Sequence, residues 1–213
     1  MSDRAARIAI VDYGMGNIGS VCHALDWLGA RHTVSNRAAE LEAAAGIILP
    51  GVGAFDAAMR NLHALGLVQL LTEEVVARGK LFLGICLGMQ LLAKDSLENG
   101  FTEGLGWIDG HVRAIEPSNG LRVPHVGWNA VSVCQSHPLF QRVGDEPYFY
   151  FDHTYHLQCG EDWIAGWCDY GERCVAAVQK DRIFGVQFHP EKSQRNGLKL
   201  LRNFLNAVYD PQP

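Results

Sequence analysis

Short apolar runs alternate with stretches of helical periodicity along the first half of this 213-residue chain. Between the runs, apolar residues recur at the spacing of an amphipathic helix. Strands and helices that alternate through short links are joined by right-handed crossovers, which make the strands parallel. The sequence therefore predicts an α/β fold with a mostly parallel central sheet flanked by helices. The expected strands are Ile8–Val11, Arg31–Val34, Gly46–Leu49 and Leu81–Ile85.

The second half of the chain has a different pattern. Gly, Pro and Asn break it into short β-like runs, which predicts antiparallel strands added to the sheet edge or forming a small second sheet. These runs are 110–115, 128–133, 148–151, 163–167 and 174–178. A final helix is expected from about Ser193, with a broad apolar stripe that packs on the sheet. Because no repeat, low-complexity segment or linker interrupts the chain, residues 1–213 are expected to form a single domain.

Composition limits the classes of partner. The net charge is −5 with scattered signs, and no basic stripe suggests a nucleic acid. No apolar stretch is long enough to span a membrane. The six cysteines are spaced irregularly, which favours reduced thiols and a cytoplasmic location over a disulfide framework.

Signals for bound metals and nucleotides are weak. The chain has neither Cys-x-x-Cys nor His-Glu-x-x-His, and the pair His153 and His156 lacks a nearby third ligand in the sequence. Gly14–Asn17 resembles half of a dinucleotide fingerprint, but its third glycine is out of register and no acidic residue ends the second strand. We therefore expect no metal and no cofactor.

The segment Gly84–Gly88 places a cysteine between two glycines, where an apolar run gives way to the helix-forming residues Met89–Ala93. A strand-to-helix turn of this form is a nucleophile elbow, since close packing at the turn favours glycine on both sides. The helix N-terminus would stabilise the thiolate of Cys86, which is its nucleophilic form. The alternative is that Cys86 is simply a small buried apolar residue, as most cysteines are.

A second segment, Phe184–Glu191, ends an apolar run at a histidine. Pro190 cannot continue a central strand, so His189 is expected at a strand end, and α/β proteins place their chemistry at that edge of the sheet. Glu191 can turn back to orient the imidazole. Cys86, His189 and Glu191 would then supply a nucleophile, a base and a group that fixes the tautomer of the base. The alternative is a solvated His-Pro-Glu turn.

The loop Pro50–Gly53 follows another strand and precedes a helical stretch. Its glycines let backbone N–H groups approach a ligand, so the loop could supply one donor to an oxyanion while the N–H of Leu87 supplies another. The alternative is a tight turn without a ligand. Gln90 lies one helical turn beyond Cys86, where it either reaches a polar substrate or is solvated.

These three segments, Gly84–Gln90, Pro50–Gly53 and Phe188–Glu191, resemble the class I (triad-type) glutamine amidotransferases. The resemblance runs essentially from end to end, and further segments look like one branch of the family. Those segments are Asp12–Asn17, Pro50–Phe55, Pro124–Asn129 and His189–Ser193. The resemblance implies a flavodoxin-like glutaminase fold and the hydrolysis of L-glutamine to glutamate and ammonia.

The resemblance also implies roles for the matching residues. Cys86 attacks the carboxamide and forms a thioester that water hydrolyses, His189 transfers the protons, and Glu191 orients His189. The implied oxyanion hole is Val52, Gly53 and Leu87; the implied substrate contacts are Gly51, Gln90, His153, Thr154 and Tyr155; the implied partner contacts are Asn17, Trp128, Tyr150 and Lys192.

The branch implies a separate partner, a (β/α)8-barrel cyclase that forms a heterodimer with the glutaminase in histidine biosynthesis. Ammonia released into neutral water is mostly protonated and no longer nucleophilic, so a docked partner with a dry path would keep it reactive. No residues are left over to bind a phosphoribosyl nucleotide, which supports a separate acceptor chain. Activity is expected to be weak alone and raised by the liganded partner, with the oxyanion loop as the two-state element.

Asp152 departs from the family pattern, which usually has an apolar residue at this position. Its carboxylate could alter the mouth of the site or pair with His153 or His156. Three other functions stay open: a paralogue that supplies ammonia for amidation of a surface-polysaccharide sugar, a stand-alone γ-glutamyl hydrolase or cysteine peptidase, and a binding module that uses the thiol for sensing. The intact His189 and Glu191 argue against the last.

Overall fold

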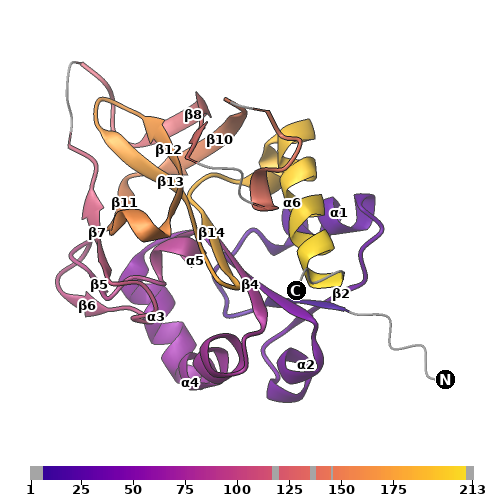
Figure 1. Cartoon of the computed structure of the whole chain (residues 1–213). Coiled ribbons are helices and arrows are strands. Elements are labelled where there is room, and N and C mark those ends of the chain that lie inside the picture. Colours follow the sequence, from indigo (N-terminus) through magenta and orange to yellow (C-terminus); the bar gives the residue numbers. More distant parts are fainter. Residues whose placement is uncertain (1–6, 117–119, 135–137, 145, 210–213) are drawn as a thin grey trace.

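A large mixed sheet runs through the computed structural model, which describes residues 7–116, 120–134, 138–144 and 146–209 (Figure 1). Within these residues the sheet has eight strands. In spatial order they are β2 (His32–Ser35), β1 (Ile8–Val11), β3 (Gly46–Gly51), β4 (Leu81–Cys86), β14 (Ile183–Val186), β13 (Arg173–Lys180), β12 (Ile164–Asp169) and β9 (Ser132–Val133). The pairs from β2 to β14 are parallel, and the pairs from β14 to β9 are antiparallel. The predicted α/β class is confirmed.

Two smaller sheets carry the remaining strands of the described residues. β10 (Tyr148–His153) pairs with β8 (His125–Ala130). The other small sheet has the order β11 (Tyr155–Cys159), β7 (Gly110–Ala114), β5 (Asp95–Ser96) and β6 (Thr102–Glu103). Both arrangements expected for the second half therefore occur, since some of its strands extend the large sheet and others form sheets of their own.

Helices cover both faces of the large sheet, and the residues of β1 alternate between two apolar clusters. Ile8 and Ile10 pack with helices α1 (Ile18–Trp27) and α6 (Gln194–Tyr209). Ala9 and Val11 pack on the other face, with α3 (Phe55–Ala64) and α4 (Leu67–Thr72). This is the period-two pattern of a strand buried on both sides.

The remaining helical segments are α2 (Ala38–Ala43), η1 (Glu73–Ala77), α5 (Leu87–Gln90), η2 (Pro138–Phe140), η3 (Glu161–Trp163) and η4 (Pro190–Lys192). Across the described residues, none of the helices combines the length and apolarity that crossing a bilayer requires.

The helix expected over Met89–Ala93 is shorter than the sequence predicts. α5 ends at Gln90 because the carbonyls of Leu91, Leu92 and Ala93 accept hydrogen bonds from the backbone N–H groups of residues 105, 108 and 106. The helical stretch after α3 changes form along its length. α4 stops at Thr72, and the π-helical turn η1 follows it.

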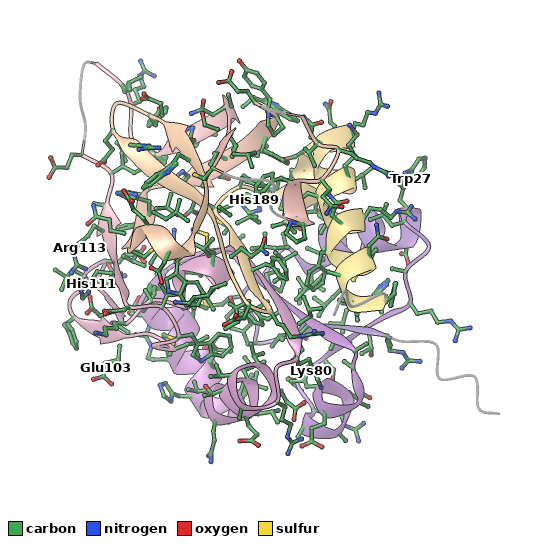
Figure 2. The ribbon with its side chains drawn as sticks, viewed as in Figure 1. Trp27, Lys80, Glu103, His111, Arg113 and His189 are labelled. Carbon is green, nitrogen blue, oxygen red and sulfur yellow. The ribbon has the colours of Figure 1, made fainter. Side chains whose placement is uncertain are left out.

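The two functional segments of the sequence meet in space at neighbouring strands. β14 pairs directly with β4, so the chain that leaves β14 reaches the same sheet edge as the end of β4. β14 ends at Val186 rather than Phe188, because the N–H of His189 bonds instead to the carbonyl of Tyr150 on β10. His189 is thereby buried inside the molecule, whereas Trp27 projects from its surface (Figure 2).

Candidate active site

The turn between β4 and α5 holds Cys86 in a backbone conformation that few side chains adopt. Its φ is +54°, and α5 starts at the next residue. A Cβ atom at Gly84 would lie 2.5 Å from the carbonyl oxygen of Gly88, and one at Gly88 would overlap the carbonyl oxygen of Leu49. Both flanking glycines are therefore required by close packing, as the sequence predicts. Because α5 is a single turn, the electrostatic support for a thiolate is smaller than that from a full helix.

His189 and Glu191 form a buried pair beside this turn. His189 Nδ1 lies 2.8 Å from Glu191 Oε1, and both side chains are almost fully enclosed. A carboxylate can only accept, so Nδ1 carries the hydrogen and Nε2 is left for the thiol. The Ser193 hydroxyl donates to the His189 carbonyl over 2.6 Å, which fixes the backbone behind the imidazole.

The electrostatics of the pair favour a charged imidazole. Burial lowers the pKa of His189, but Cys86 and the hydrogen-bonded Glu191 carboxylate outweigh this effect and raise the pKa to about 10. At neutral pH the ring is thus protonated. A protonated imidazole beside a thiol can stabilise the thiolate once it forms, and it carries a proton for a leaving group.

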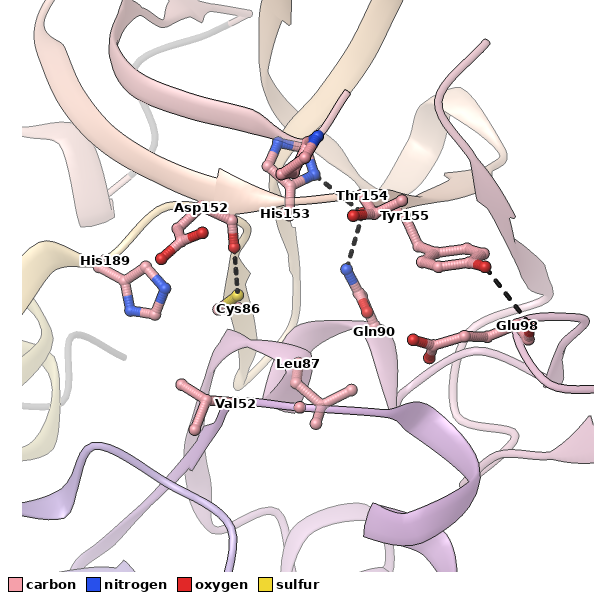
Figure 3. Close-up of a pocket in the computed structure, with 12 residues that line it drawn as sticks. Val52, Cys86, Leu87, Gln90, Glu98, Asp152, His153, Thr154, Tyr155 and His189 are labelled. Atoms are coloured by element: carbon pink, nitrogen blue, oxygen red, sulfur yellow. Dashed lines mark hydrogen bonds between the residues drawn. The ribbon is translucent and has the colours of Figure 1, made fainter. Parts of the chain in front are cut away.

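A cavity of about 270 Å³ opens at this edge of the sheet (Figure 3). The residues to which the sequence assigned catalysis, the oxyanion hole or substrate contact line it, except Glu191 and Gly51. The lining residues are Val52, Gly53, Cys86, Leu87, Gln90, Glu98, Pro124, Asp152, His153, Thr154, Tyr155 and His189. A cavity of this size suits a single amino acid better than a peptide.

The loop that ends β3 is shaped by its glycines. A Cβ atom at Gly51 would lie 2.6 Å from the hydroxyl of Tyr13 and 2.8 Å from Cβ of Leu87. Gly53 has a φ of +100°, which disfavours any other residue. Val52 between them points its side chain into the cavity (Figure 3). The loop thus brings backbone close to Cys86, and its share in an oxyanion hole stays a prediction.

Two glutamine side chains connect the cavity wall to the thiol. Gln90 Nε2 donates to the carbonyl of Tyr155 over 2.8 Å and to Gln187 Oε1 over 3.0 Å. Gln187 Nε2 in turn donates to Cys86 Sγ over 3.6 Å. Gln90 is therefore buried with its amide nitrogen hydrogen-bonded twice, and it is not a solvated helix residue. Gln187 was missed, although it lies in the segment that ends at His189; its only signal was a polar residue inside an apolar run.

A relay of neutral histidines supports the opposite wall. His153 Nδ1 lies 2.8 Å from the carbonyl of Tyr155, and this carbonyl can only accept, so Nδ1 carries the hydrogen. His153 Nε2 must then accept from His125 Nδ1, which lies 2.9 Å away. His125 Nε2 accepts in turn from the amide of Asn129. Burial lowers the pKa of His153 to about 3 and that of His125 to about 4, which keeps both rings neutral.

Glu98 is a further cavity residue that the sequence did not reveal. It lies in a loop between two short strands, without a motif around it. Its Oε2 accepts a hydrogen bond from the backbone N–H of Phe55 over 2.7 Å, which holds the carboxylate in place at the cavity. A fixed carboxylate at this point can bind a cationic group of a ligand.

Asp152 does not pair with either histidine that the sequence offered. His153 is committed to the relay, and His156 lies beside Glu172 instead. The Asp152 side chain lies on the exposed face of β10 and points toward His189 at the cavity (Figure 3). Its backbone carbonyl lies 3.9 Å from Cys86 Sγ and accepts a weak hydrogen bond from it.

Three of the four expected partner residues form one patch next to the cavity. Trp128 and Tyr150 pair across β8 and β10 with ring centroids 6.1 Å apart. Lys192 Nζ lies 5.6 Å from the centre of the Tyr150 ring. Asn17 lies apart from these contacts, before α1, where its side chain accepts from Ser20. Trp128 is 46% exposed, so the patch offers apolar area to solvent.

Sequence comparison identifies relatives over nearly the whole chain. The family model "glutamine amidotransferase class-I" matches residues 9–208. The HisH 2 subunit of imidazole glycerol phosphate synthase from Vibrio vulnificus is 48% identical, covering 95% of both chains. The HisH 1 subunit from Campylobacter jejuni is 44% identical, covering 92% of this chain and 98% of the relative.

Solved structures agree with this result at the level of the fold. A glutamine amidotransferase crystal structure matches with a TM-score of 0.73 at 19% identity, covering 94% of this chain and 98% of the other. The structure of PurLQS from Thermotoga maritima also matches with a TM-score of 0.73, at 20% identity, covering 95% and 99%. The chain belongs to the class I glutamine amidotransferases and, within them, to the family of HisH subunits of imidazole glycerol phosphate synthase.

Proposed function

We propose that this chain hydrolyses L-glutamine to glutamate and ammonia, with Cys86, His189 and Glu191 as its catalytic residues. The observation that carries the proposal is the buried pair of His189 and Glu191 beside a thiol on a strained elbow. Family membership makes the chain a glutamine amidotransferase, and this geometry supports the assignment of the catalytic roles to these three residues.

The proposed reaction starts from a Cys86 thiolate beside a protonated His189. The Cys86 thiolate attacks the side-chain carbonyl carbon of glutamine, and the charged imidazole of His189 gives its proton to the departing nitrogen, which leaves as ammonia. A thioester on Cys86 remains. His189, now neutral, takes a proton from water, and the resulting hydroxide attacks the thioester to release glutamate and the thiolate. Glu191 holds the tautomer throughout.

The tetrahedral intermediates need donors for their oxyanion. We assign this role to the backbone N–H of Leu87, directly after the nucleophile, together with a peptide N–H from the loop at Val52 and Gly53. The glycines on both sides of Val52 support the assignment, because they allow the loop backbone to change conformation.

The opposite end of the cavity would hold the amino-acid end of the substrate. We assign the Glu98 carboxylate to bind the ammonium group of glutamine, because its negative charge at this end of the cavity complements the positive charge of that group. The backbone of His153, Thr154 and Tyr155, held by Gln90 and the histidine relay, would contact the remaining polar atoms. Gly51 would act only indirectly, by letting the loop approach Cys86.

We further propose that ammonia passes to a (β/α)8-barrel cyclase chain, with which this chain forms a heterodimer in the cytoplasm. The pair would make imidazole glycerol phosphate and AICAR in histidine biosynthesis. The exposed face of β8 and β10 supports a docking surface, because it carries Trp128 and Tyr150 and borders the cavity through Asp152. A partner seated there would cover the mouth and keep ammonia out of water.

A second candidate is a paralogue that supplies ammonia for amidation of a surface-polysaccharide sugar. Two observations favour keeping it. Several relatives carry copy numbers in their names, such as HisH 1 of Campylobacter jejuni and HisH 2 of Pseudomonas aeruginosa. In addition, Asp152 puts a charge on the partner-facing rim of the cavity.

Glutamate release, measured with and without the barrel cyclase of the same organism, tests the proposed chemistry. We expect weak release alone, strong release with the liganded partner, and loss of both in Cys86→Ala, while Cys134→Ala retains them. A glutamine-like electrophile such as a diazo-oxo-norleucine should label Cys86. Unchanged release from Cys86→Ala would refute the mechanism, and strong release without any partner would favour the stand-alone hydrolase.

Genetic complementation separates the two pathways. The gene should restore growth without histidine to a strain that lacks its own HisH subunit. An active glutaminase that fails to restore growth, even when expressed with its own cyclase, would assign the chain to the surface-sugar pathway instead.

A further inference from the structure

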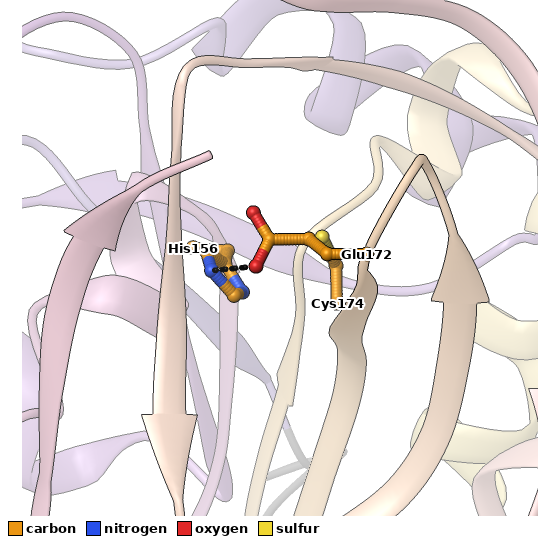
Figure 4. Close-up of side chains that lie close together, drawn as sticks. All are labelled: His156, Glu172 and Cys174. Atoms are coloured by element: carbon orange, nitrogen blue, oxygen red, sulfur yellow. Dashed lines mark ion pairs between the residues drawn. The ribbon is translucent and has the colours of Figure 1, made fainter. Parts of the chain in front are cut away.

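A second cluster of reactive side chains lies outside the cavity, where β11 packs beside β13. It consists of His156 on β11, Glu172 just before β13, and Cys174 on β13 (Figure 4). One ligand atom of each residue lies within 4.8 Å of those of the other two. His156 and Cys174 are buried, while the Glu172 side chain is 31% exposed and leaves one side open to solvent.

The imidazole of His156 is unusual because neither of its nitrogens has a hydrogen-bond partner among the residues that the structure describes. The residue is 2% exposed, and neither Nδ1 nor Nε2 makes a hydrogen bond of ordinary geometry. A buried polar group without a partner costs free energy, so its persistence needs an explanation. Nε2 lies 3.9 Å from Glu172 Oε2, too far for a hydrogen bond and close to the spacing of two ligands on one metal ion.

We propose that His156, Glu172 and Cys174 bind a divalent transition-metal ion of the zinc type. An imidazole nitrogen, a thiolate sulfur and a carboxylate oxygen form the ligand set that zinc prefers, whereas Mg²⁺ and Ca²⁺ prefer oxygen alone. Tetrahedral zinc needs ligand atoms about 3.3–3.8 Å apart, so the three groups have to close only slightly around the ion. On binding, the Cys174 thiol releases its proton to solvent as the metal–sulfur bond forms.

Neighbouring groups complete the arrangement. Glu172 Oε1 accepts a hydrogen bond from the backbone N–H of Glu116 over 2.9 Å, which turns Oε2 toward His156. Cys168 lies opposite Cys174 in the ladder between β12 and β13, and its buried thiol interacts with that of Cys174. The partly exposed Glu172 leaves room for a water molecule as the fourth ligand.

The site could not be seen in the sequence because its ligands come from separate strands. In the sequence, His153 and His156 stood out as a possible metal-binding pair. In the structure His153 instead hydrogen-bonds with His125, and the ion's other two ligands are Glu172, just before β13, and Cys174 on β13. The ion would tie β11 to β13 immediately after Tyr155, whose carbonyl receives Gln90 at the cavity. Its role is therefore structural, as a brace behind the substrate-binding wall.

Cobalt binding to the reduced, metal-free full-length protein tests the proposal. Cys86→Ser serves as the background, so that the active-site thiol cannot bind the probe. One equivalent of Co²⁺ should produce a thiolate-to-cobalt charge-transfer band, Zn²⁺ should abolish the band by displacement, and Zn²⁺ should raise the thermal midpoint.

Added to this background, Cys174→Ser should abolish the band, and Glu172→Gln should weaken Zn²⁺ binding at least about 10-fold. Glu172→Gln is the safer variant for folding because the side chain is partly exposed. The matched control Cys134→Ser removes an exposed thiol and should leave the band intact. The proposal is overturned if no band forms at one equivalent, or if the band survives in a folded Cys174→Ser variant.

Discussion

Gln187 donates a hydrogen bond from Nε2 to Cys86 Sγ over 3.6 Å, although 101 positions separate the two residues. Its own Oε1 accepts from Gln90, so the donating amide group is held in place from the far side. A donor fixed in this way stabilises negative charge on the sulfur.

Gln187→Met removes this donor while it keeps a buried side chain of similar size. A hydrogen bond to a charged group is worth about 1.5–3 kcal/mol, so kcat for glutamine hydrolysis should fall about 10- to 100-fold. The rate of alkylation of Cys86 by iodoacetamide at fixed pH should fall with it. Because a merely structural role would not slow alkylation of the folded protein, an unchanged alkylation rate would contradict this account.

The Glu191 carboxylate helps to keep His189 protonated, so Glu191→Gln should change the pH profile. Hydrogen bonds with Cys86 and Glu191 raise the pKa of His189 to about 10, against the opposing effect of burial. Replacing the Glu191 carboxylate by an amide lowers the pKa of His189. The alkaline limb of kcat/KM should therefore move to lower pH, with at least about a 10-fold loss of kcat. Glu103→Gln, at an exposed position, should leave the limb in place. A limb that does not move in Glu191→Gln would show that the carboxylate does not act on His189.

The elbow glycines make a prediction about stability. A Cβ atom at Gly88 would overlap the backbone oxygen of Leu49, which cannot move without distorting β3. Gly88→Ala should therefore lower the free energy of unfolding by about 3 kcal/mol or more. Gly19→Ala is the matched control, because this helical glycine has nothing within 4 Å of a new Cβ. It should instead stabilise the protein by about 0.5–1 kcal/mol in denaturant unfolding. Equal effects of the two substitutions would contradict the packing argument.

The features that the sequence revealed are local ones. Gly84, Cys86 and Gly88 could be recognised because close packing at a strand-to-helix turn permits little else, and this requirement is written into five consecutive residues. The parallel arrangement of the first strands followed from the alternation of periods. The meeting of Cys86 with His189 could be expected because both follow strands that end at one sheet edge.

The features that the sequence concealed depend on contacts between distant strands. Glu98 reaches the cavity from a loop without any motif, and His125 joins the relay only because β8 pairs with β10. The early end of α5 has the same origin, since the carbonyls after Gln90 bond to residues 105–108. No local pattern contains this information.

The neutral histidine relay predicts that the protein loses stability in mild acid. Burial lowers the pKa of His153 to about 3, whereas an unfolded histidine binds a proton near pH 6.5. Between these values the unfolded chain binds more protons, so the free energy of unfolding should fall as the pH falls, by up to about 1.4 kcal/mol per pH unit from His153. His189 adds little slope in this window, because below pH 6.5 the ring is charged in both states; the stability that its raised pKa contributes is lost as the pH rises from about 6.5 to about 10.

Denaturant unfolding between pH 7 and pH 4.5 measures this slope. His153→Gln should reduce it, even if the variant is less stable at pH 7, because one of the two buried neutral rings is gone and only His125 still contributes. His63→Gln, which removes an exposed histidine on α3, should retain the slope of the parent protein. A parent protein that is equally stable across this range would contradict the assignment of neutral rings.

The patch of Trp128, Tyr150 and Lys192 predicts where the partner binds. Trp128 is 46% exposed and stacks edge-on against Tyr150, so it can enter an apolar pocket of another chain at little entropic cost. Trp128→Ala should weaken binding of the barrel cyclase at least about 10-fold, measured by calorimetry with the purified partner. Trp27→Ala is the control: this tryptophan is 79% exposed at the end of α1, so its loss removes similar apolar area elsewhere on the surface. If both variants bind the cyclase equally well, the partner docks on another face.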